Sequence, residues 1–185
     1  MQKWRTICVD PPWRYQRTLV QKGANGQPIR GAAAHYNTMS LEELAELPVA
    51  DWVERDAHLY LWTTNAFMLE AYELMAAWGF SYKTTITWVK TQIGMGMYFR
   101  NTTEHILFGV RGSLKLLRKD LLTHFIAPRA RHSEKPQAFY DMVETASPGP
   151  YLDVFARKQR MGWSVAGNEV YSCIPELAAK PRDAL

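Results

Sequence analysis

The sequence predicts an α/β fold built around one mainly parallel sheet. Short apolar runs rich in β-branched residues alternate along the chain with segments of helical periodicity, and strands that alternate with helices usually pair in parallel. The chain has 185 residues, of which 47% are hydrophobic, and no linker, repeat or long charge block divides it. We therefore expect a single domain over residues 1–185.

The first predicted strand, residues 6–9, ends abruptly at Asp10. Pro11 and Pro12 cannot donate to a β-ladder, and Pro11 biases Asp10 away from helix. The polar, glycine-rich residues 14–34 are too long for an ordinary connection, so we expect a mobile loop at the active site. Residues 174–185 are expected to form a tail.

Local signals mark the ends of the remaining elements. Ser40 and Glu43 form the capping-box pattern of a short helix that ends near residue 47. Asn65 and Gly79 bracket a second helix, and Ser133 is the expected cap of a third. These longer helices are expected at residues 65–78 and 136–146, and the further strands at residues 58–62, 82–89, 104–110, 121–126 and 151–155.

Composition excludes several classes of protein. No apolar run approaches the roughly 20 residues of a membrane span, and the N-terminus leaves no room for a signal peptide, so we expect an intracellular protein. Cys8 and Cys173 lack metal-type spacing and are interpreted as buried, reduced thiols. The five histidines are scattered, so no metal site is expected. The glycine fingerprints of dinucleotide and P-loop sites are absent as well.

The net charge is +4 and the pI is near 9.1, and the basic residues are unevenly distributed. A basic stretch between residues 111 and 135 holds seven of them against two acidic residues. It has two interpretations, a surface that follows a phosphate backbone or an ordinary solvated face. Its basic members are Arg111, Lys115, Arg118, Lys119, Arg129, Arg131 and Lys135.

The tetrapeptide of residues 10–13 is a candidate site because it directly follows a predicted strand. In an open α/β sheet, ligands bind beyond the carboxyl ends of the strands. The Asp10 carboxylate and the Pro11 carbonyl would supply acceptors there, and the Trp13 ring would supply an aromatic plate. This combination suits a planar base that carries an amino group. The alternative is a surface turn with Trp13 packed in the core.

A second candidate site follows the last predicted strand, in residues 150–160. Asp153 near the end of that strand suits a ribose hydroxyl or an ammonium group, and Arg157 beyond it suits a carboxylate. S-adenosylmethionine carries all three groups. Gly167, Asn168 and Glu169 would bracket a ribose or adenine edge by hydrogen bonds, although a simple turn with a cap is the alternative.

Nine motifs in their order along the chain resemble the DPPW-type adenine N6-methyltransferases, the MT-A70 family. The resemblance covers residues 6–170 and is closest to the bacterial and bacteriophage members rather than to the larger messenger-RNA enzymes. The motifs occupy residues 10–13, 35–40, 59–63, 78–80, 87–91, 100–105, 132–136, 153–157 and 162–169.

The resemblance implies a Rossmann-like methyltransferase fold with helices on both faces of the sheet, and S-adenosylmethionine as cofactor. It also implies a permuted order, in which the catalytic tetrapeptide precedes the cofactor-binding strand. By resemblance, Asp10 and the Pro11 carbonyl accept hydrogen bonds from the adenine N6 amino group. The other residues implied are Pro12 within the catalytic turn, Trp13 and Tyr36 at the ring, Lys90 and Asn101 at a bordering loop, and Asp153, Arg157, Asn168 and Glu169 at the cofactor.

The resemblance makes DNA the favoured substrate, in the cytoplasm of a bacterial or phage-infected cell. The sequence leaves open an RNA adenine methyltransferase and a catalytically silent nucleic-acid-binding partner. We expect no separate target-recognition domain, so low sequence selectivity and reliance on a homodimer are both compatible with the sequence.

Overall fold

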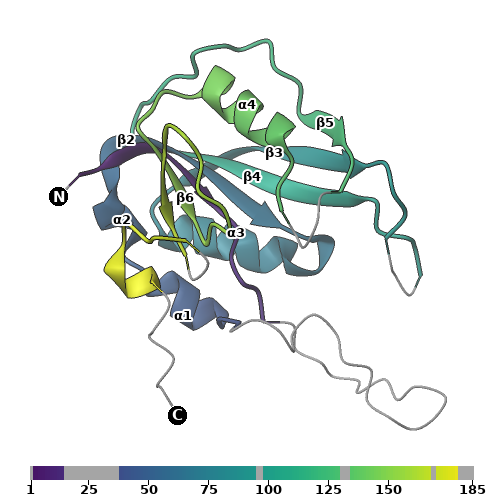
Figure 1. Cartoon of the computed structure of the whole chain (residues 1–185), viewed down its shortest axis with the longest axis horizontal. Coiled ribbons are helices and arrows are strands. Elements are labelled where there is room, and N and C mark those ends of the chain that lie inside the picture. The colour runs from purple at the N-terminus through teal and green to yellow at the C-terminus, as the bar shows by residue number, and fades with distance from the viewer. Residues whose placement is uncertain (1, 15–37, 95–97, 130–133, 168–169, 179–185) are drawn as a thin grey trace, which may run out of the picture.

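A seven-stranded sheet organises the computed structural model of the chain, which describes residues 2–14, 38–94, 98–129, 134–167 and 170–178 (Figure 1). The strands lie in the order β5-β3-β4-β2-β1-β6-β7. Their bounds are β1 Trp4–Val9, β2 Val53–Thr63, β3 Ser81–Lys90, β4 Thr103–Arg111, β5 His124–Ala127, β6 Tyr151–Val154 and β7 Trp163–Ala166. The helices are α1 Leu41–Ala45, α2 Val49–Trp52, α3 Met68–Ala77 and α4 Gln137–Ala146, with short 3₁₀ turns η2 Asn65–Phe67 and η3 Pro175–Leu177.

The sheet is mainly parallel, as the sequence predicts. The neighbouring pairs β1–β2, β1–β6, β6–β7 and β3–β5 are parallel. Only β4 runs the other way among these strands, because it is antiparallel to both β2 and β3. The carboxyl ends of β1, β2, β3, β5, β6 and β7 therefore share one edge of the sheet, which we call the carboxyl edge.

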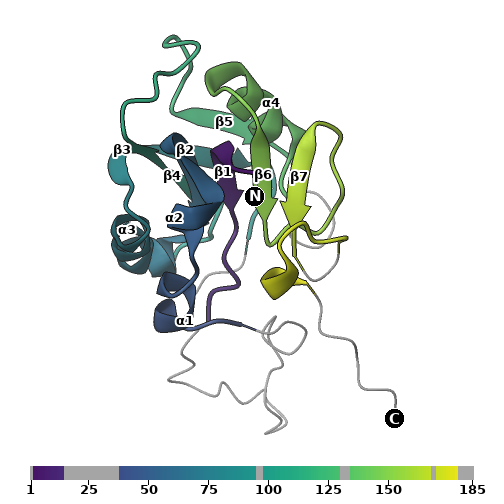
Figure 2. The same ribbon diagram turned by 90° about the vertical axis from the view of Figure 1, so that its left-hand side faces the viewer.

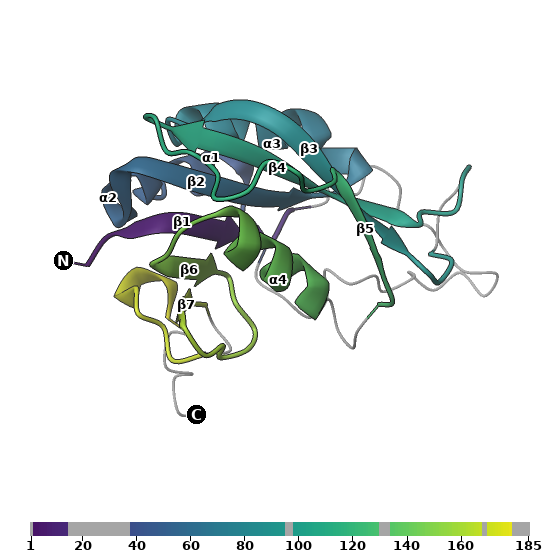
Figure 3. The ribbon, with the colours of Figure 1, turned by 90° about the horizontal axis from the view of Figure 1, so that it is seen from above.

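Helices cover both faces of the sheet. Figures 2 and 3 show α1 and α3 on one side and α4 on the other. One apolar cluster joins Leu74 of α3 to strand residues such as Ile7, and a second joins Phe139 of α4 to Trp62. Successive residues of β2, Leu59 and Tyr60, belong to different clusters, because side chains alternate between the faces of a strand. This is the expected fold of the Rossmann-like class.

The strand order changes direction at β1. From β1 the chain first builds outward through β2, and much later it returns to place β6 on the other side. Cys8 of β1 pairs with Asp153 of β6, although the two residues are 145 positions apart. Ligands of open α/β sheets bind at such a switch point, in the crevice outside the carboxyl ends of the strands. The topology thus predicts a ligand site at the carboxyl ends of β1 and β6.

Most predicted elements form where the sequence places them. The capping box is present, because the Ser40 side chain accepts from the Glu43 backbone and Glu43 accepts from the Ser40 backbone. The predicted helix at residue 65 is wrong at its start: it begins as η2, and the Asn65 side chain provides no cap. Asn65 instead bonds His105 at 2.8 Å, so a tertiary contact replaces the local one. Strand β7 has no counterpart among the predicted strands.

Two assignments near the C-terminus change. Cys8 is buried as expected, but Cys173 is exposed, because it follows β7 on a surface segment. Within residues 174–185, expected as a tail, η3 forms and both Ile174 and Leu177 join the core. The predicted cap Ser133 and the predicted loop beyond Arg14 lie outside the described residues.

None of the helices in the described ranges is long and apolar enough to cross a membrane. The longest, α3 and α4, have ten residues each, whereas a span needs about 20. Within the same ranges, no group of three or more His, Cys, Asp or Glu side chains is arranged to hold a metal ion.

We predict that Gly79→Ala lowers the free energy of unfolding by about 1 kcal/mol. Gly79 ends α3 with φ +79°, and a Cβ there would meet no atom within 4 Å, so backbone strain is the whole cost. Urea unfolding measures the change. Gly79→Asn should cost less, because Asn tolerates this conformation better than Ala. Equal losses in the two variants would contradict the strain argument.

Candidate active site

The turn of residues 10–13 leaves the sheet at the carboxyl end of β1. The Asp10 amide donates to the Val154 carbonyl at 3.3 Å, which holds the start of the turn beside β6. Within the turn, the Trp13 amide donates to the Pro11 carbonyl at 2.8 Å. The Pro12 carbonyl accepts from the Met39 amide at 2.9 Å. Two prolines and three backbone hydrogen bonds therefore restrain the backbone of the turn that carries Asp10.

The Trp13 ring lies inside the protein. The residue is 9% exposed, its ring stacks on Phe67 with centroids 5.2 Å apart, and its Nε1 donates to the Trp62 carbonyl at 3.3 Å. Phe67 therefore covers one face of the ring, so Trp13 anchors the turn to the core. The Asp10 side chain differs, because 29% of it remains exposed. In the described structure the tetrapeptide presents a carboxylate rather than an open aromatic plate.

A chain of alternating charges connects Asp10 to the end of β3. Lys135 Nζ lies 3.0 Å from Asp10 Oδ2 and 3.3 Å from Glu104 Oε2. The other Glu104 oxygen, Oε1, lies 2.5 Å from Lys90 Nζ. Lys135 Nζ also lies 4.3 Å from the centre of the Trp62 ring, a cation–π distance. We call these four charged residues the ion chain.

Burial makes the ion chain strong. Only 11% of the Lys135 side chain and 8% of the Lys90 side chain are exposed. Burial lowers the pKa of Lys135, but the charges of Asp10 and Glu104 outweigh it and raise that pKa above its ordinary value. Burial raises the pKa of Glu104, and the ammonium groups of Lys135 and Lys90 bring it below its ordinary value. Lys135 and Glu104 thus stay charged at neutral pH.

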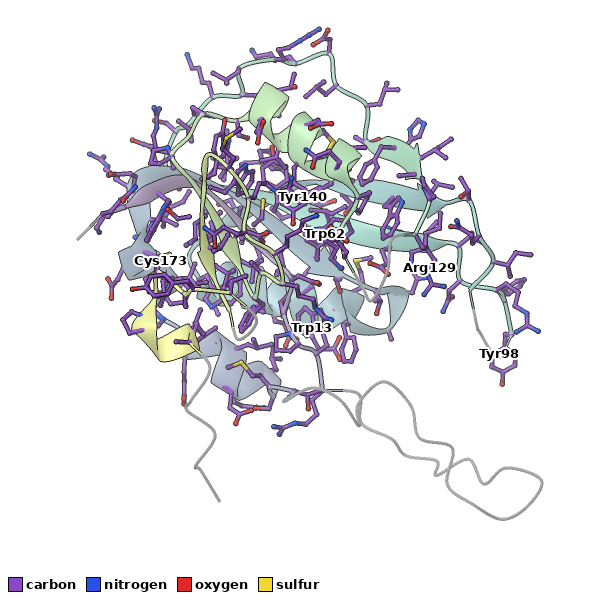
Figure 4. All side chains as sticks on the ribbon, viewed as in Figure 1. Trp13, Trp62, Tyr98, Arg129, Tyr140 and Cys173 are labelled. Atoms are coloured by element: carbon purple, nitrogen blue, oxygen red, sulfur yellow. The ribbon has the colours of Figure 1, made fainter. Side chains whose placement is uncertain are left out.

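A pocket opens at the switch point between β1 and β6. Asp10 lies on its wall, so the ion chain ends in the pocket. Asp153 and Tyr140 form another part of that wall, and Figure 4 shows Tyr140 beside Trp62 in the middle of the molecule. The lining is Asp10, Trp62, Glu134, Lys135, Tyr140, Asp153, Phe155, Ala156, Arg157, Lys158 and Arg160.

Asp153 is a buried carboxylate with an unusual pKa. It is 7% exposed, and Tyr140 Oη donates to its Oδ2 at 2.8 Å. Burial and, to a lesser extent, the nearby Asp10 carboxylate raise the pKa of Asp153, whereas the Tyr140 hydrogen bond, Arg160 and Lys135 lower it, and together they leave this pKa at about 7. Among the described residues no cation forms a direct ion pair with Asp153, although the charges of Arg160 and Lys135 act on it. A ligand ammonium or hydroxyl group would satisfy it.

Basic side chains form a further part of the wall. The guanidinium carbon of Arg160 lies 3.4 Å from the centre of the Tyr140 ring, and its Nη1 donates to Gln137 Oε1 at 2.5 Å. Arg157 is half-buried, and Lys158 is exposed and pairs with Glu134 at 3.1 Å. These cations suit a ligand carboxylate.

The backbone after β6 is strained where it borders the pocket. Phe155 has φ 62°, a left-handed conformation that costs a residue with a side chain about 1 kcal/mol or more. The Ala156 amide donates to the Ala166 carbonyl at 3.0 Å, which pins this turn to the end of β7. Gly167 follows, and a Cβ there would lie 2.5 Å from the Ala156 carbonyl oxygen. Strand β7 thus supports the turn that carries Arg157.

The fold brings together only some of the predicted site residues. Asp10, Asp153 and Arg157 line one pocket, and Lys90 reaches it through the ion chain. Asn101 is exposed on the loop between β3 and β4 and is not part of the pocket lining. Tyr36, Asn168 and Glu169 lie outside the described residues.

Three residues of this site received no role in the catalytic or cofactor site from the sequence. Lys135 and Glu104 belong to motifs of the resemblance, but a charge pair distant in sequence leaves no signal in either motif. Tyr140 lies on the buried face of α4, where helical periodicity marks it only as core.

The basic stretch does not form one surface. Lys135 is part of the ion chain, whereas Arg118 pairs with Asp120 on the loop before β5. That loop and Arg111, the last residue of antiparallel β4, lie at the opposite edge of the sheet from Asp10. Arg129 follows β5 at the carboxyl edge. The interpretation of the stretch as a single phosphate-binding surface is therefore wrong. Of the four residues Arg111, Arg118, Arg129 and Lys135, only Arg129 is left as a phosphate contact near Asp10.

The sheet is Rossmann-like, and its switch-point pocket combines two carboxylates with several cations. This combination is typical of enzymes that bind nucleoside-derived cofactors. The sequence model of the MT-A70 family matches residues 4–169, so the chain belongs to the MT-A70 family. Members of this family use S-adenosylmethionine as the methyl donor. The expected family, fold and cofactor are thereby confirmed.

Curated relatives include enzymes of different lengths. The Type II methyltransferase M.MunI of Mycoplasma sp is 30% identical over 91% of this chain and 78% of its own length. The N(6)-adenosine-methyltransferase subunit METTL3 of Danio rerio is 27% identical, over 96% of this chain and 30% of its own length. The N(6)-adenine-specific methyltransferase METTL4 of Homo sapiens is 26% identical, over 89% of this chain. The chain spans about a third of the latter two proteins.

The pocket residues fit S-adenosylmethionine. Asp153 offers a buried acceptor, which suits the ammonium group or a ribose hydroxyl. Arg157 and Arg160 offer cations for the carboxylate. Asp10 lies on the same wall, so a methyl group carried in this pocket would be close to the turn of residues 10–13.

We predict that the stability of the protein falls between about pH 5 and about pH 8 through the titration of Asp153. Its pKa is about 7 in the fold and about 3.9 in the unfolded chain, so the native state binds more protons in this window. The free energy of unfolding therefore decreases as pH rises, by roughly 2 to 3 kcal/mol from this group.

Urea unfolding of the wild type and of Asp153→Asn across that window measures this contribution. The variant should lose less stability than the wild type as pH rises. Parallel curves for the two proteins would contradict a raised pKa at this position.

Proposed function

We propose that this protein transfers a methyl group from S-adenosylmethionine to the N6 amino group of adenine in DNA. The observation that supports it most is the position of Asp10. A rigid turn holds this carboxylate, part-exposed, on the wall of a pocket that also contains Asp153 and Arg157. One side of the pocket thus offers an acceptor for the base, and the other offers partners for the cofactor.

The target amino group needs acceptors because its lone pair is delocalised into the adenine ring. Asp10 and the Pro11 carbonyl would accept the two amino hydrogens and localise the lone pair on nitrogen. The Pro11 carbonyl already accepts from the Trp13 amide, but a carbonyl has two lone pairs. Positive charge develops on N6 as the new bond forms, and a preorganised carboxylate stabilises that charge. The proton leaves N6 afterwards, so Asp10 need not act as a general base.

Lys135 would orient Asp10 for this role. Its ammonium group binds Asp10 Oδ2 at 3.0 Å, which leaves Oδ1 for the amino group. Glu104 holds Lys135 from the other side, and Lys90 in turn holds Glu104. The acceptor is thus fixed before substrate arrives, which lowers the reorganisation needed during the reaction.

S-adenosylmethionine, when bound, supplies an electrophilic methyl group on a sulfonium centre. Asp153 would accept from its ammonium or ribose hydroxyl groups, and Arg157 would bind its carboxylate. Asn168 and Glu169 are assigned to the cofactor, and Tyr36 to the base, by resemblance alone. Trp13 would act by anchoring the turn, and Asn101 by bordering the substrate path.

DNA is favoured over RNA because the chain resembles the short bacterial and bacteriophage members. The similarity to the Mycoplasma methyltransferase over most of that protein's length is in line with this choice. Such an enzyme would act in the cytoplasm of a bacterial or phage-infected cell. The relatives named as N(6)-adenosine methyltransferases keep RNA as the alternative substrate.

We predict that Asp10→Ala lowers the rate of methyl transfer by a factor of hundreds or more while the protein stays folded. Removing one well-placed polar group typically costs about 3 to 4 kcal/mol of transition-state stabilisation. Methylation of adenine-containing DNA with labelled cofactor measures the rate, and thermal unfolding tests the fold.

Asp120→Asn is the matched control, because this carboxylate also pairs with a cation but lies before β5 at the opposite edge. The control should retain full activity. Undiminished turnover by Asp10→Ala would refute the assigned role.

We predict that incubation with labelled cofactor yields N6-methyladenine in DNA. Duplex DNA, single-stranded DNA and RNA of matched sequence are compared, and the product nucleoside is identified after digestion. N6-methyladenosine from RNA alone would replace DNA by RNA as the substrate. Methylated cytosine or methylated protein alone would overturn the proposal.

Calorimetric titration with S-adenosylmethionine separates an active enzyme from a silent partner subunit. An enzyme should bind the cofactor, and Asp153→Asn should weaken that binding. The absence of binding to the wild-type protein would favour a nucleic-acid-binding role without catalysis.

A further inference from the structure

The loop between β3 and β4 carries two aromatic side chains that pack against almost nothing. Tyr98 is 95% exposed and Phe99 is 87% exposed. Soluble proteins rarely leave large apolar groups together on the surface unless the surface binds something. We call the described residues of this loop, 91–94 and 98–102, the finger. The finger is not part of the turn of residues 10–13, and none of its described residues lines the pocket.

Backbone contacts hold the two ends of the finger together. The Lys90 amide donates to the Thr102 carbonyl at 2.7 Å, which continues the β3–β4 ladder into the loop. Further into the loop, the two sides of the chain pass so close together that a Cβ at Gly94 would collide with the Asn101 carbonyl oxygen. The two described sides of the finger therefore lie against each other, and they extend beyond the ends of β3 and β4 (Figure 1).

The finger stands on the same edge as the catalytic turn. It leaves from the carboxyl end of β3, and β3 runs parallel to β1. Lys90 and Glu104, which flank its base, are two members of the ion chain that ends at Asp10. Three strand spacings of about 4.8 Å separate β3 from β1, so the finger base lies about 14 Å from Asp10. That distance corresponds to about four stacked nucleotides.

Cations accompany the aromatic pair. Arg100, next to Phe99, is exposed, and so is Arg129, which follows β5 at the same edge. The Arg129 amide donates to Gln92 Oε1 at 2.8 Å, so the segment after β5 is bound to the finger. Figure 4 shows Tyr98 and Arg129 at one end of the molecule, away from Cys173. Aromatic rings interleaved with arginines form the usual surface for a nucleic-acid strand.

We propose that the finger binds the substrate strand, with Tyr98 and Phe99 stacked on nucleobases a few positions from the target adenine. Arg100 and Arg129 contact the phosphates of the same strand. Stacking is tolerant of sequence, because every base has a π-face. This inference rests on the proposed function for the identity of the target, but it concerns binding rather than methyl transfer. It assigns the substrate a flanking strand whose bases are unpaired or locally opened.

The test measures binding of a short fluorescein-labelled single-stranded DNA by fluorescence anisotropy. The double variant Tyr98→Ala/Phe99→Ala should bind about ten- to several hundredfold more weakly than the wild type. The aromatic replacement Tyr98→Trp/Phe99→Trp should restore most of the affinity, which a loss of local structure would not allow. Affinity for S-adenosylmethionine should be the same in all three proteins.

Tyr82→Ala is the matched control, because Tyr82 is a part-exposed tyrosine at the opposite end of β3. It should leave DNA affinity unchanged. Shortening the DNA to the target and its nearest neighbours should abolish the difference between the wild type and the double alanine variant, since the finger lies several nucleotides away.

Unchanged DNA affinity in the double alanine variant would overturn the inference. A dimer of the wild type that this variant dissociates, with unchanged DNA affinity, would also overturn it and assign the finger to a second copy of the chain. If the wild type binds DNA through the finger but transfers no methyl group, the inference stands and the proposed function fails.

Discussion

A largely buried ammonium group is the constraint on which the site depends. The Lys135 ammonium group contacts Asp10, Glu104 and the Trp62 ring. A buried ammonium group needs such partners to stay charged. Each neighbour comes from a different strand or its end, so the two ion pairs and the cation–π contact join β1, β4 and β2 at one point. Removing one partner of a buried pair is costly because it leaves an uncompensated charge. The carboxylate proposed to act on the base thus also stabilises the structure.

The sheet topology explains why such distant residues meet. Parallel strands place their carboxyl ends on one edge, and the reversal at β1 puts Asp10 beside Asp153. Antiparallel β4 brings Glu104 to the same edge because its amino end lies there. The permuted order of the motifs is therefore compatible with an ordinary switch-point site, since only spatial neighbours matter to the chemistry.

The sequence predicted the elements better than it predicted the contacts between them. Ser40 and Gly79 act through local backbone geometry, so their signals are visible in a few adjacent residues. The Trp13 ring could not be placed from the sequence, because it is buried against Phe67 of η2. That contact depends on how η2 packs beside the turn after β1. Lys135 shows it again: among seven basic residues of one stretch, nothing local distinguishes the one that pairs with Asp10. Short β7 was missed because its stability comes from pairing with β6.

The two carboxylates of the pocket are electrostatically linked, and this links the two halves of the proposed reaction. The Asp10 charge raises the pKa of Asp153, while Lys135 lowers it, so the ion chain influences the proton on Asp153. A positively charged donor would favour ionised Asp153, because an opposite charge nearby stabilises the charged form. Near neutral pH, cofactor binding would then release a proton. The base-handling carboxylate would, by its own charge, tune how readily the methyl donor enters the pocket.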